Sequence, residues 1–334
     1  FQNLNFDEAI KMFDLSLQHS NYNQNLAAEA TYWQAESYYR VENYPKATEG
    51  YNRFILTPGA FNLPEFNMAH YNLGYAYFKM KNYDEAIVWF RKFTSLSNDE
   101  KNIYVGDAYN RIGDSFFIQR RYWAAIDYYD KAILIDKTDA DYAAFQRGFS
   151  LGLVERPQKK VESLLALTTK YPNSNYMDDA IFELAESYMV LNQLNDAKAN
   201  YQKIERYYTG SSYYVKALVQ LGLIYYNTEN PDTAMQYYKR VVEGFPGTQE
   251  AKNALIGIRN IYVDKGDAST YFEYASKLGS IANMSLAEKD SLTYMAAEKL
   301  YVNGDCDKSN LAFTQYLKDF PQGSFAINSN YYLG

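Results

Sequence analysis

Nonpolar residues along this chain recur at helical spacing in segments that alternate with short polar breaks. In residues 217–225, the nonpolar side chains follow a period near 3.6 around the small residue Gly222. A polar break at 227–231 separates this segment from a second one with the same period, which ends at 245–247. Proline and glycine at that end stop a helix, and threonine begins one well. The pattern therefore predicts two antiparallel helices, followed by a new helix capped by Thr248.

This two-helix unit repeats along the chain. A small residue of the first helix returns every 35 to 39 residues, apart from one gap of 75 residues that leaves position 259 without it. A second small residue follows twelve positions later in most units. Small residues let two helices cross closely, and aromatic residues fill the space between units, so the stack is stable only collectively. The first series is Ala35, Gly74, Gly113, Gly148, Ala185, Gly222, Ala297 and Gly334; the second is Ala47, Ala86, Ala125, Ala197, Ala234 and Ser309.

This spacing resembles that of the tetratricopeptide repeat family, in which Tyr, Ala, an aromatic residue and Pro follow the small residue at fixed positions. Gly222, Tyr225, Ala234, Tyr238 and Pro246 match that pattern position by position. The resemblance implies an all-α fold, a right-handed superhelix of about eight complete helix pairs with a partial helix hairpin at each end. It covers the chain as one solenoid, 1–334, with a partial unit at 1–26, repeats at about 27–65, 66–103, 104–138, 139–175, 176–212, 213–248, 249–286 and 287–322, and a partial unit at 323–334.

The two expected partial units lack the polar capping repeat that a solenoid needs for solubility. Residues 6–18 have the pattern of a second helix without its first, and residues 323–334 that of a first helix which stops at Gly334. We therefore expect the natural protein to continue in both directions.

Two units depart from the regular pattern. In residues 249–279, Arg259 stands where the small residue is expected, and Tyr271 stands where alanine is expected. Either the two helices move apart, or the turn at 265–267 shifts the register of the second helix, and we expect the register shift. A third interpretation makes Arg259 a ligand contact. In residues 148–161 the second small position falls one residue late, which predicts a one-residue insertion in the turn.

Composition narrows the range of partners. The net charge of −7 argues against nucleic acid, whose binding depends on clustered lysine and arginine. The 36 tyrosines suit both packing and contact surfaces, because a tyrosine ring is nonpolar and its hydroxyl is polar. No run approaches 18 consecutive nonpolar residues, so we expect no transmembrane segment in this region.

The residues that carry most catalytic and metal chemistry are scarce. The chain has two histidines, His19 and His70, and one cysteine, Cys306. They form no Ser-His-Asp or Cys-His arrangement and no metal-ligand cluster in the sequence. His70 lies four residues before Gly74, a position expected to pack in the core or line a groove. We therefore expect no enzyme activity, no catalytic residues, no metal and no cofactor.

In the resembled family the first helices line an inner, concave groove, and this implies where a partner binds. The relevant positions lie three before, one after and four after each small residue, on one face of the first helix. Aromatic rings beside carboxylates favour a peptide with basic and nonpolar side chains, or a sugar that stacks on the rings. The rings could equally pack against neighbouring helices. The predicted groove residues are Tyr32, Glu36, Tyr39, Tyr71, Tyr75, Phe78, Asn110, Asp114, Phe117, Phe145, Phe149 and Glu186.

Two functions follow as hypotheses. The first is a non-enzymatic protein–protein interaction scaffold that binds a partner segment in the groove. The second is a glycan-binding accessory protein that uses the tyrosine-rich face. Chaperone-binding tetratricopeptide domains hold a C-terminal carboxylate with lysine and asparagine at these groove positions. This chain has tyrosine and glutamate there, so we expect no such carboxylate clamp.

The cellular location is also inferred from resemblance. The phrases at 171–174, 245–248 and 320–324 are similar to those of long-repeat tetratricopeptide proteins in bacterial cell envelopes. This implies a periplasmic or outer-membrane-associated protein, with the cytoplasm as the alternative. The identity of the partner and the oligomeric state stay open.

Overall fold

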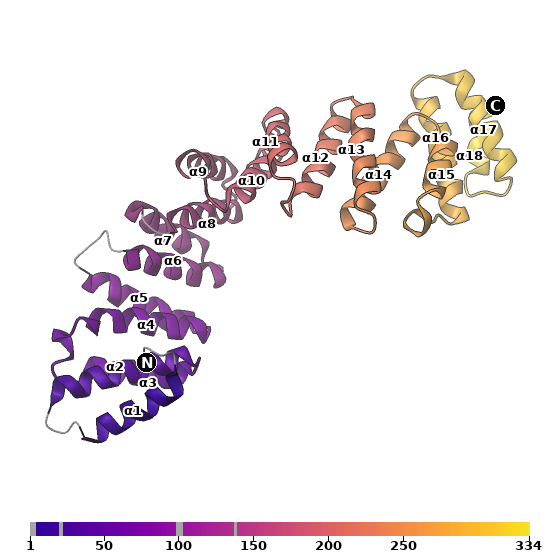
Figure 1. Ribbon diagram of the computed structural model, residues 1–334. Coiled ribbons are helices and arrows are strands. Elements are labelled where there is room, and N and C mark those ends of the chain that lie inside the picture. Colours follow the sequence, from indigo (N-terminus) through magenta and orange to yellow (C-terminus); the bar gives the residue numbers. More distant parts are fainter. Residues whose placement is uncertain (1–4, 20–22, 98–102, 137–138) are drawn as a thin grey trace. The chain divides into compact units, whose positions relative to one another are not determined.

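The computed structural model describes residues 5–19, 23–97, 103–136 and 139–334. Within these ranges the chain forms eighteen α-helices and two short 3-10 helices (Figure 1). Helix α1 (Phe6–His19) comes first, eight helix pairs follow in chain order, and α18 (Ala326–Leu333) comes last. The predicted all-α class and number of pairs are confirmed. The pairs are α2 (Gln24–Arg40) and α3 (Tyr44–Leu56), α4 (Glu65–Lys79) and α5 (Tyr83–Leu96), α6 (Ile103–Ile118) and α7 (Tyr122–Ile135), α8 (Ala140–Leu153) and α9 (Pro157–Lys170), α10 (Met177–Val190) and α11 (Leu194–Tyr207), α12 (Tyr214–Asn227) and α13 (Pro231–Gly244), α14 (Gln249–Asp264) and α15 (Ala268–Ser276), and α16 (Leu286–Val302) and α17 (Cys306–Asp319).

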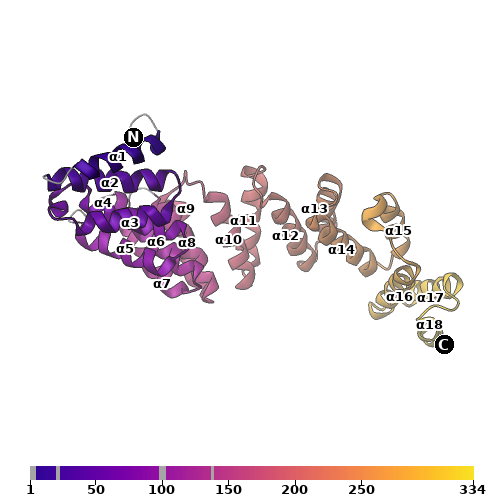
Figure 2. The same ribbon diagram turned by 90° about the horizontal axis from the view of Figure 1, so that it is seen from below.

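The chain divides into two compact units, unit 1 at Phe1–Leu191 and unit 2 at Asn192–Gly334. We call the even-numbered helices α2–α16 the first helices and the odd-numbered helices α3–α17 the second helices. In unit 1, each of α2, α4, α6 and α8 contacts the next first helix, and in unit 2 α14 contacts both α12 and α16 (Figures 1 and 2). The repeat boundaries proposed above stay a prediction.

The turn from first to second helix has the same backbone conformation in all eight pairs. The residue seven positions after the small-residue position adopts a left-handed φ, between 56° and 80°. Such a residue ends an α-helix, because its conformation redirects the chain while the last carbonyls stay hydrogen-bonded. These residues are Glu42, Lys81, Arg120, Glu155, Asn192, Glu229, Gly266 and Gly304.

This regularity corrects the expected register shift at 265–267. Gly266 falls in the series, and the Asp267 N–H donates to the Tyr262 carbonyl at 2.9 Å, as the Asn230 N–H does to Tyr225. The predicted shift is therefore wrong. Instead, α15 exchanges the side-chain sizes at two of its own positions. Tyr271 is buried at 4% exposure at the alanine position, and the small Ala275 takes the position of the aromatic ring.

The expected insertion between 148 and 161 is wrong for the same reason, because Glu155 also falls in the series. Lys160 occupies the position where every other second helix except α15 carries a small residue. Gly152 makes room for it, since a Cβ atom at Gly152 would lie 3.0 Å from the Cδ atom of Lys160. A large side chain in one helix is thus matched by a glycine in its partner.

Gly74, Gly113 and Gly222 of the first helices accommodate aromatic rings rather than a neighbouring backbone. A Cβ atom added at Gly222 would lie 2.5 Å from the ring of Tyr238, and one at Gly74 would lie 2.6 Å from the ring of Phe90. Each ring fills the centre of its unit, where close packing leaves no room for another methyl group. The aromatic residues predicted for the second helices are buried: Tyr51, Phe90, Tyr129, Tyr201, Tyr238 and Phe313.

The proline-containing phrases form the turn out of the second helix. The Phe245 N–H donates to the Val241 carbonyl at 3.0 Å, which closes α13, and Gly247 adopts a φ of 86°. Thr248 then caps α14, because its Oγ1 atom accepts from the Ala251 N–H at 3.1 Å. The helix stop and the threonine cap predicted from the sequence are confirmed.

Candidate functional site

The first-helix positions of unit 1 hold buried polar networks. Glu36 is only 7% exposed, and its carboxylate accepts hydrogen bonds from the Tyr51 hydroxyl at 2.6 Å and the Asn72 amide at 3.1 Å. Arg40 donates to the same carboxylate at 2.9 Å. Tyr32 is buried beside it. Glu36 therefore serves as an internal acceptor among the helices of unit 1.

Tyr71 and Tyr75 also have internal partners. Their hydroxyls both donate to the Asp107 Oδ2 atom, at 2.7 and 2.5 Å, and their rings meet edge to face at 5.0 Å. Burial, together with the Asp107 carboxylate, raises the pKa of both hydroxyls well above the usual value. The two tyrosines therefore stay protonated as donors, and each ring is half-buried by its neighbours.

A second network is centred on Asp114, which is 7% exposed. Its carboxylate accepts from the hydroxyls of Tyr129 and Tyr142, at 2.9 and 2.7 Å, and pairs with the Arg111 guanidinium at 2.6 Å. Burial raises the pKa of this carboxyl, and Arg111 and the tyrosine hydroxyls oppose that rise. Asn110 is fully buried and donates to the Asp139 carbonyl at 3.2 Å.

The predicted nonpolar residues divide between packing and open pockets. The ring of Tyr39 packs on Tyr44 at 5.4 Å, and the ring of Phe145 stacks on Tyr176 at 5.6 Å. A pocket of about 230 Å³ opens between α4, α6 and α8 in unit 1. It brings together three predicted residues, Phe78, Asp114 and Phe117.

A second pocket of unit 1, of about 560 Å³, opens between α8 and α10 beside the N-terminus of α9. Phe149 and Glu186 line it, as do the exposed side chains of Leu153 and Val190. Lys160 also lines it and forms an ion pair with Glu183. The pocket thus combines the half-buried ring of Phe149 and exposed aliphatic side chains with the charged side chains of Lys160 and Glu186. The assignment of the twelve residues to a partner site stays a prediction.

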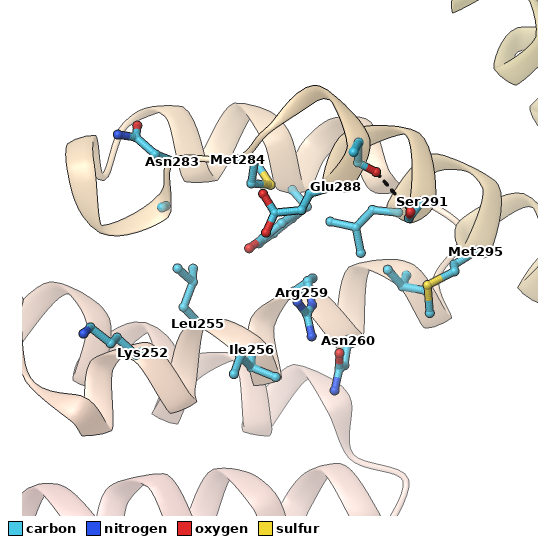
Figure 3. A pocket seen from close by; sticks show the side chains of 15 residues that line it. Lys252, Leu255, Ile256, Arg259, Asn260, Asn283, Met284, Glu288, Ser291 and Met295 are labelled. Carbon is cyan, nitrogen blue, oxygen red and sulfur yellow. Dashed lines mark hydrogen bonds between the residues drawn. The ribbon is translucent and has the colours of Figure 1, made fainter. Parts of the chain in front are cut away.

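Unit 2 holds a pocket that the sequence pattern did not assign. It occupies about 580 Å³ between α14 and α16, and side chains from both helices point into it (Figure 3). Arg259 lies at its centre, with Leu255 and Ile256 on the same helix and Glu288 on the facing one. The feature of the sequence that indicates this pocket is Arg259 at a small-residue position, for which the pattern favoured a register shift over a ligand contact.

Within the described ranges, no group of three or more His, Cys, Asp or Glu side chains is placed to hold a metal ion. Among the described helices, none combines the length and nonpolar character that crossing a lipid bilayer requires.

Comparison with family models identifies repeats in both units. Residues 65–138 match one tetratricopeptide repeat model, and residues 179–211 and 216–248 match another. These segments therefore have the pattern of tetratricopeptide repeats, which are generally protein–protein interaction modules. No enzyme family was matched, and no curated protein matches the sequence.

Among solved structures, the first of the two below shares the fold. The C-terminal part of a TPR repeat-containing protein from Cytophaga hutchinsonii is 19% identical, with a TM-score of 0.61, over 76% of this chain and 96% of that one. PilF from Pseudomonas aeruginosa is 17% identical, with a TM-score of 0.47, over 69% of this chain and 96% of that one. At such identities the likeness concerns the fold alone.

Proposed function

We propose that this chain is a non-enzymatic scaffold that holds a segment of a partner protein along the open side of its first helices. One observation carries the proposal: pockets open between successive first helices in each unit, at α4–α6–α8, at α8–α10 and at α14–α16. Repeats of this family are generally interaction modules, and successive pockets on one set of helices suit an extended ligand that crosses several repeats.

The chemistry of these pockets favours protein over glycan. Nonpolar side chains such as Ile118 and Val190 are 49% and 75% exposed at the two pockets of unit 1. Burial of such side chains drives protein association. A sugar needs an open ring face on which to stack, whereas the rings of Tyr71 and Tyr75 pack on each other and on Phe90.

The same proposal places the protein in the bacterial envelope, in the periplasm or at the outer membrane. This part is supported by the resemblance of the proline-containing turns at 171–174, 245–248 and 320–324 to those of envelope tetratricopeptide proteins. Cell fractionation with the protein expressed from its complete reading frame tests it, and recovery in the cytoplasmic fraction alone contradicts it.

The scaffold function is tested by a charge placed on the pocket rims. Ile118→Glu with Val190→Glu adds two carboxylates at exposed nonpolar positions of α6 and α10, so we expect folding to persist and partner binding to fail. The matched control is Leu134→Glu, which adds a carboxylate at an 82% exposed position of the second helix α7.

The readout is affinity capture from the native host, followed by quantitative mass spectrometry. Proteins that the unaltered chain and Leu134→Glu retain, and that the double variant loses, are the expected partners. The proposal fails when the double variant, with an unchanged circular dichroism spectrum, captures the same proteins as the unaltered chain.

A further inference from the structure

Arg259 is displaced from the core of its helix pair. In the pair α12/α13, the equivalent position is Gly222, whose missing side chain gives room to the ring of Tyr238. In α14/α15, Tyr271 fills the centre of the pair and the small Ala275 replaces the ring. The long side chain of Arg259 therefore leaves the core and reaches the pocket between α14 and α16.

The early end of α15 completes this pocket. Helix α15 has 9 residues, against 14 in α13, and a 3-10 turn at Gly279–Ala282 follows it. Ala282, Asn283 and Met284 then line the pocket, and Figure 3 shows Asn283 and Met284 across it from Lys252 and Leu255 of α14. The irregular repeat thus creates a lined cavity where a regular pair continues its second helix.

The pocket is elongated along α14. Lys252, Ile256 and Asn260 line it at four-residue spacing, which corresponds to about 12 Å at 1.5 Å per residue. An extended peptide advances roughly 3.3 Å per residue, so about four residues fit this length. The volume of about 580 Å³ lies within the range of ordinary ligand pockets.

The guanidinium of Arg259 is available for a ligand. Arg259 is half-buried, and its charge acts on Glu288 and Tyr271, but within the described ranges its guanidinium forms no hydrogen bond or ion pair. The carboxylate that lines the pocket, that of Glu288, is held by its own helix cap, since it accepts from the Ser285 N–H at 2.7 Å and the Ser285 hydroxyl at 2.8 Å. A half-buried guanidinium that lacks hydrogen-bond acceptors favours an anion that supplies them.

Charge and polarity define the anion. Two cations, Lys252 and Arg259, face one carboxylate, Glu288, so the pocket carries a net charge of +1 in a chain of −7. A single negative charge matches this balance, whereas a dianion such as phosphate is repelled by Glu288. Nonpolar walls surround the charge, and methionines at two of these positions adapt to different side chains. The larger aliphatic and methionine side chains of these walls are Leu255, Ile256, Val263, Met284, Leu292 and Met295.

We propose that this pocket binds an internal, extended segment of a partner protein in which an aspartate or glutamate is flanked by nonpolar side chains. The proposal rests on the scaffold function above and names the chemistry of one ligand. The acidic residue meets Arg259, and its neighbours cover the nonpolar walls on both sides. Arg259 lies between Lys252 and Val263 along α14, so the pocket holds chain on each side of the charge.

A peptide array tests this chemistry. The probes are peptides of roughly seven residues with both ends blocked, each with a central glutamate flanked by Leu, Ile, Val, Met or Phe. Every probe has a partner with glutamine at the centre, and a third set has a free C-terminal carboxylate and no acidic side chain. We expect the glutamate probes to bind the full chain about tenfold or more tightly than their glutamine partners, because hydrogen bonds to charged groups are the stronger ones.

Two variants assign that preference to the pocket. Arg259→Gln keeps a polar side chain of similar length and is expected to bind both sets equally. Met295→Glu places a carboxylate at a 47% exposed pocket position and is expected to weaken binding of the glutamate probes. The matched control is Arg206→Gln, which removes an exposed cation from the second helix α11 and should leave the preference intact.

Equal binding of glutamate and glutamine probes overturns the proposal, as does a preference that survives Arg259→Gln or an array on which no blocked probe binds. If the probes with a free C-terminal carboxylate bind more tightly than the blocked glutamate probes, the ligand is a chain end and the proposal of an internal segment is wrong. If affinity capture depends on the rims of unit 1 while the array shows no acidic preference, only this inference fails. If capture does not depend on those rims, the scaffold proposal fails.

Discussion

At the scale of single residues, tyrosine hydroxyls decide the role of the buried carboxylates. Glu36 and Asp114 each lie one position after a small residue, and each accepts from the tyrosine fifteen residues later, Tyr51 and Tyr129. A buried carboxylate without donors is strongly destabilising, and a buried hydroxyl also needs a partner. These acids are therefore part of the packed core of their repeats. Ligand binding in the open pockets beside them depends on nonpolar contacts.

His70 gives unit 1 a defined dependence on pH. It is 4% exposed, and its Nδ1 atom lies 2.9 Å from the Phe66 carbonyl, so the neutral ring donates a hydrogen bond there. Burial lowers its pKa below the usual value. The unfolded chain therefore binds a proton more readily, and the contribution of His70 to stability is present above about pH 6.5 and is lost as pH falls through the folded-state pKa.

We expect unaltered unit 1 to lose more stability than His70→Gln between about pH 7.5 and about pH 5, because glutamine does not titrate. Urea unfolding followed by tryptophan fluorescence measures this difference, since Trp33, Trp89 and Trp123 all lie in unit 1. Every other titrating group is common to both proteins. Parallel stability curves for the two proteins contradict the prediction.

At the scale of helix pairs, side-chain sizes are exchanged between partners. Lys160 occupies a small-residue position in α9, and Gly152 in α8 leaves room for it. Its ammonium group pairs with Glu183 on α10, and the two side chains are only 12% and 17% exposed. This pair is therefore part of the packing of α8, α9 and α10 within unit 1.

A double-mutant cycle tests that role. Lys160→Met leaves the Glu183 carboxylate partly buried without its partner, so we expect unfolding free energy to fall by about 1–3 kcal/mol. Adding Glu183→Leu should recover part of this loss, because a nonpolar pair replaces the ion pair. The exposed pair Lys308–Asp305 is the control, and Lys308→Met should change stability by well under about 1 kcal/mol. If the changes in unfolding free energy for Lys160→Met and Glu183→Leu, measured by urea unfolding, simply add in the double variant, the two side chains are not coupled and the prediction is wrong.

At the scale of the whole molecule, repeat arrays are stabilised by contacts between neighbours, so a local defect should stay local. Gly222→Ala forces a methyl group against the ring of Tyr238 at 2.5 Å, an overpacking that costs about 1–3 kcal/mol. Gly244→Ala is the matched control in the same unit, because a Cβ atom there meets nothing within 4 Å.

Hydrogen exchange measured by mass spectrometry should show lost protection in α12–α14 of Gly222→Ala and unchanged protection in unit 1. Gly244→Ala should resemble the unaltered protein throughout. A loss of protection spread evenly over both units contradicts local coupling, and an equal loss in Gly244→Ala contradicts the packing explanation.

The helix pairs, their number and the ladder of small residues could be predicted because each depends on residues within one unit. Helical periodicity, caps such as Thr248 and the glycine that faces Tyr238 are all local features. The two register predictions were wrong because an exchange of sizes and a shift of register look alike in sequence. The two explanations are distinguished by the left-handed residues Glu155 and Gly266, which lie seven positions after the small-residue position, as in every other pair.

The sequence by itself determined an all-α chain of eight helix pairs, because periodicity and short turns fix which segments become helices. The tertiary structure decided which polar residues are buried and which cavities stay open. Glu36 meets Tyr51 and Asn72, and Arg259 meets no described partner, only because side chains from other helices fill or leave the adjacent space. That outcome depends on the volumes of residues facing one another across helices, and no single helix records it.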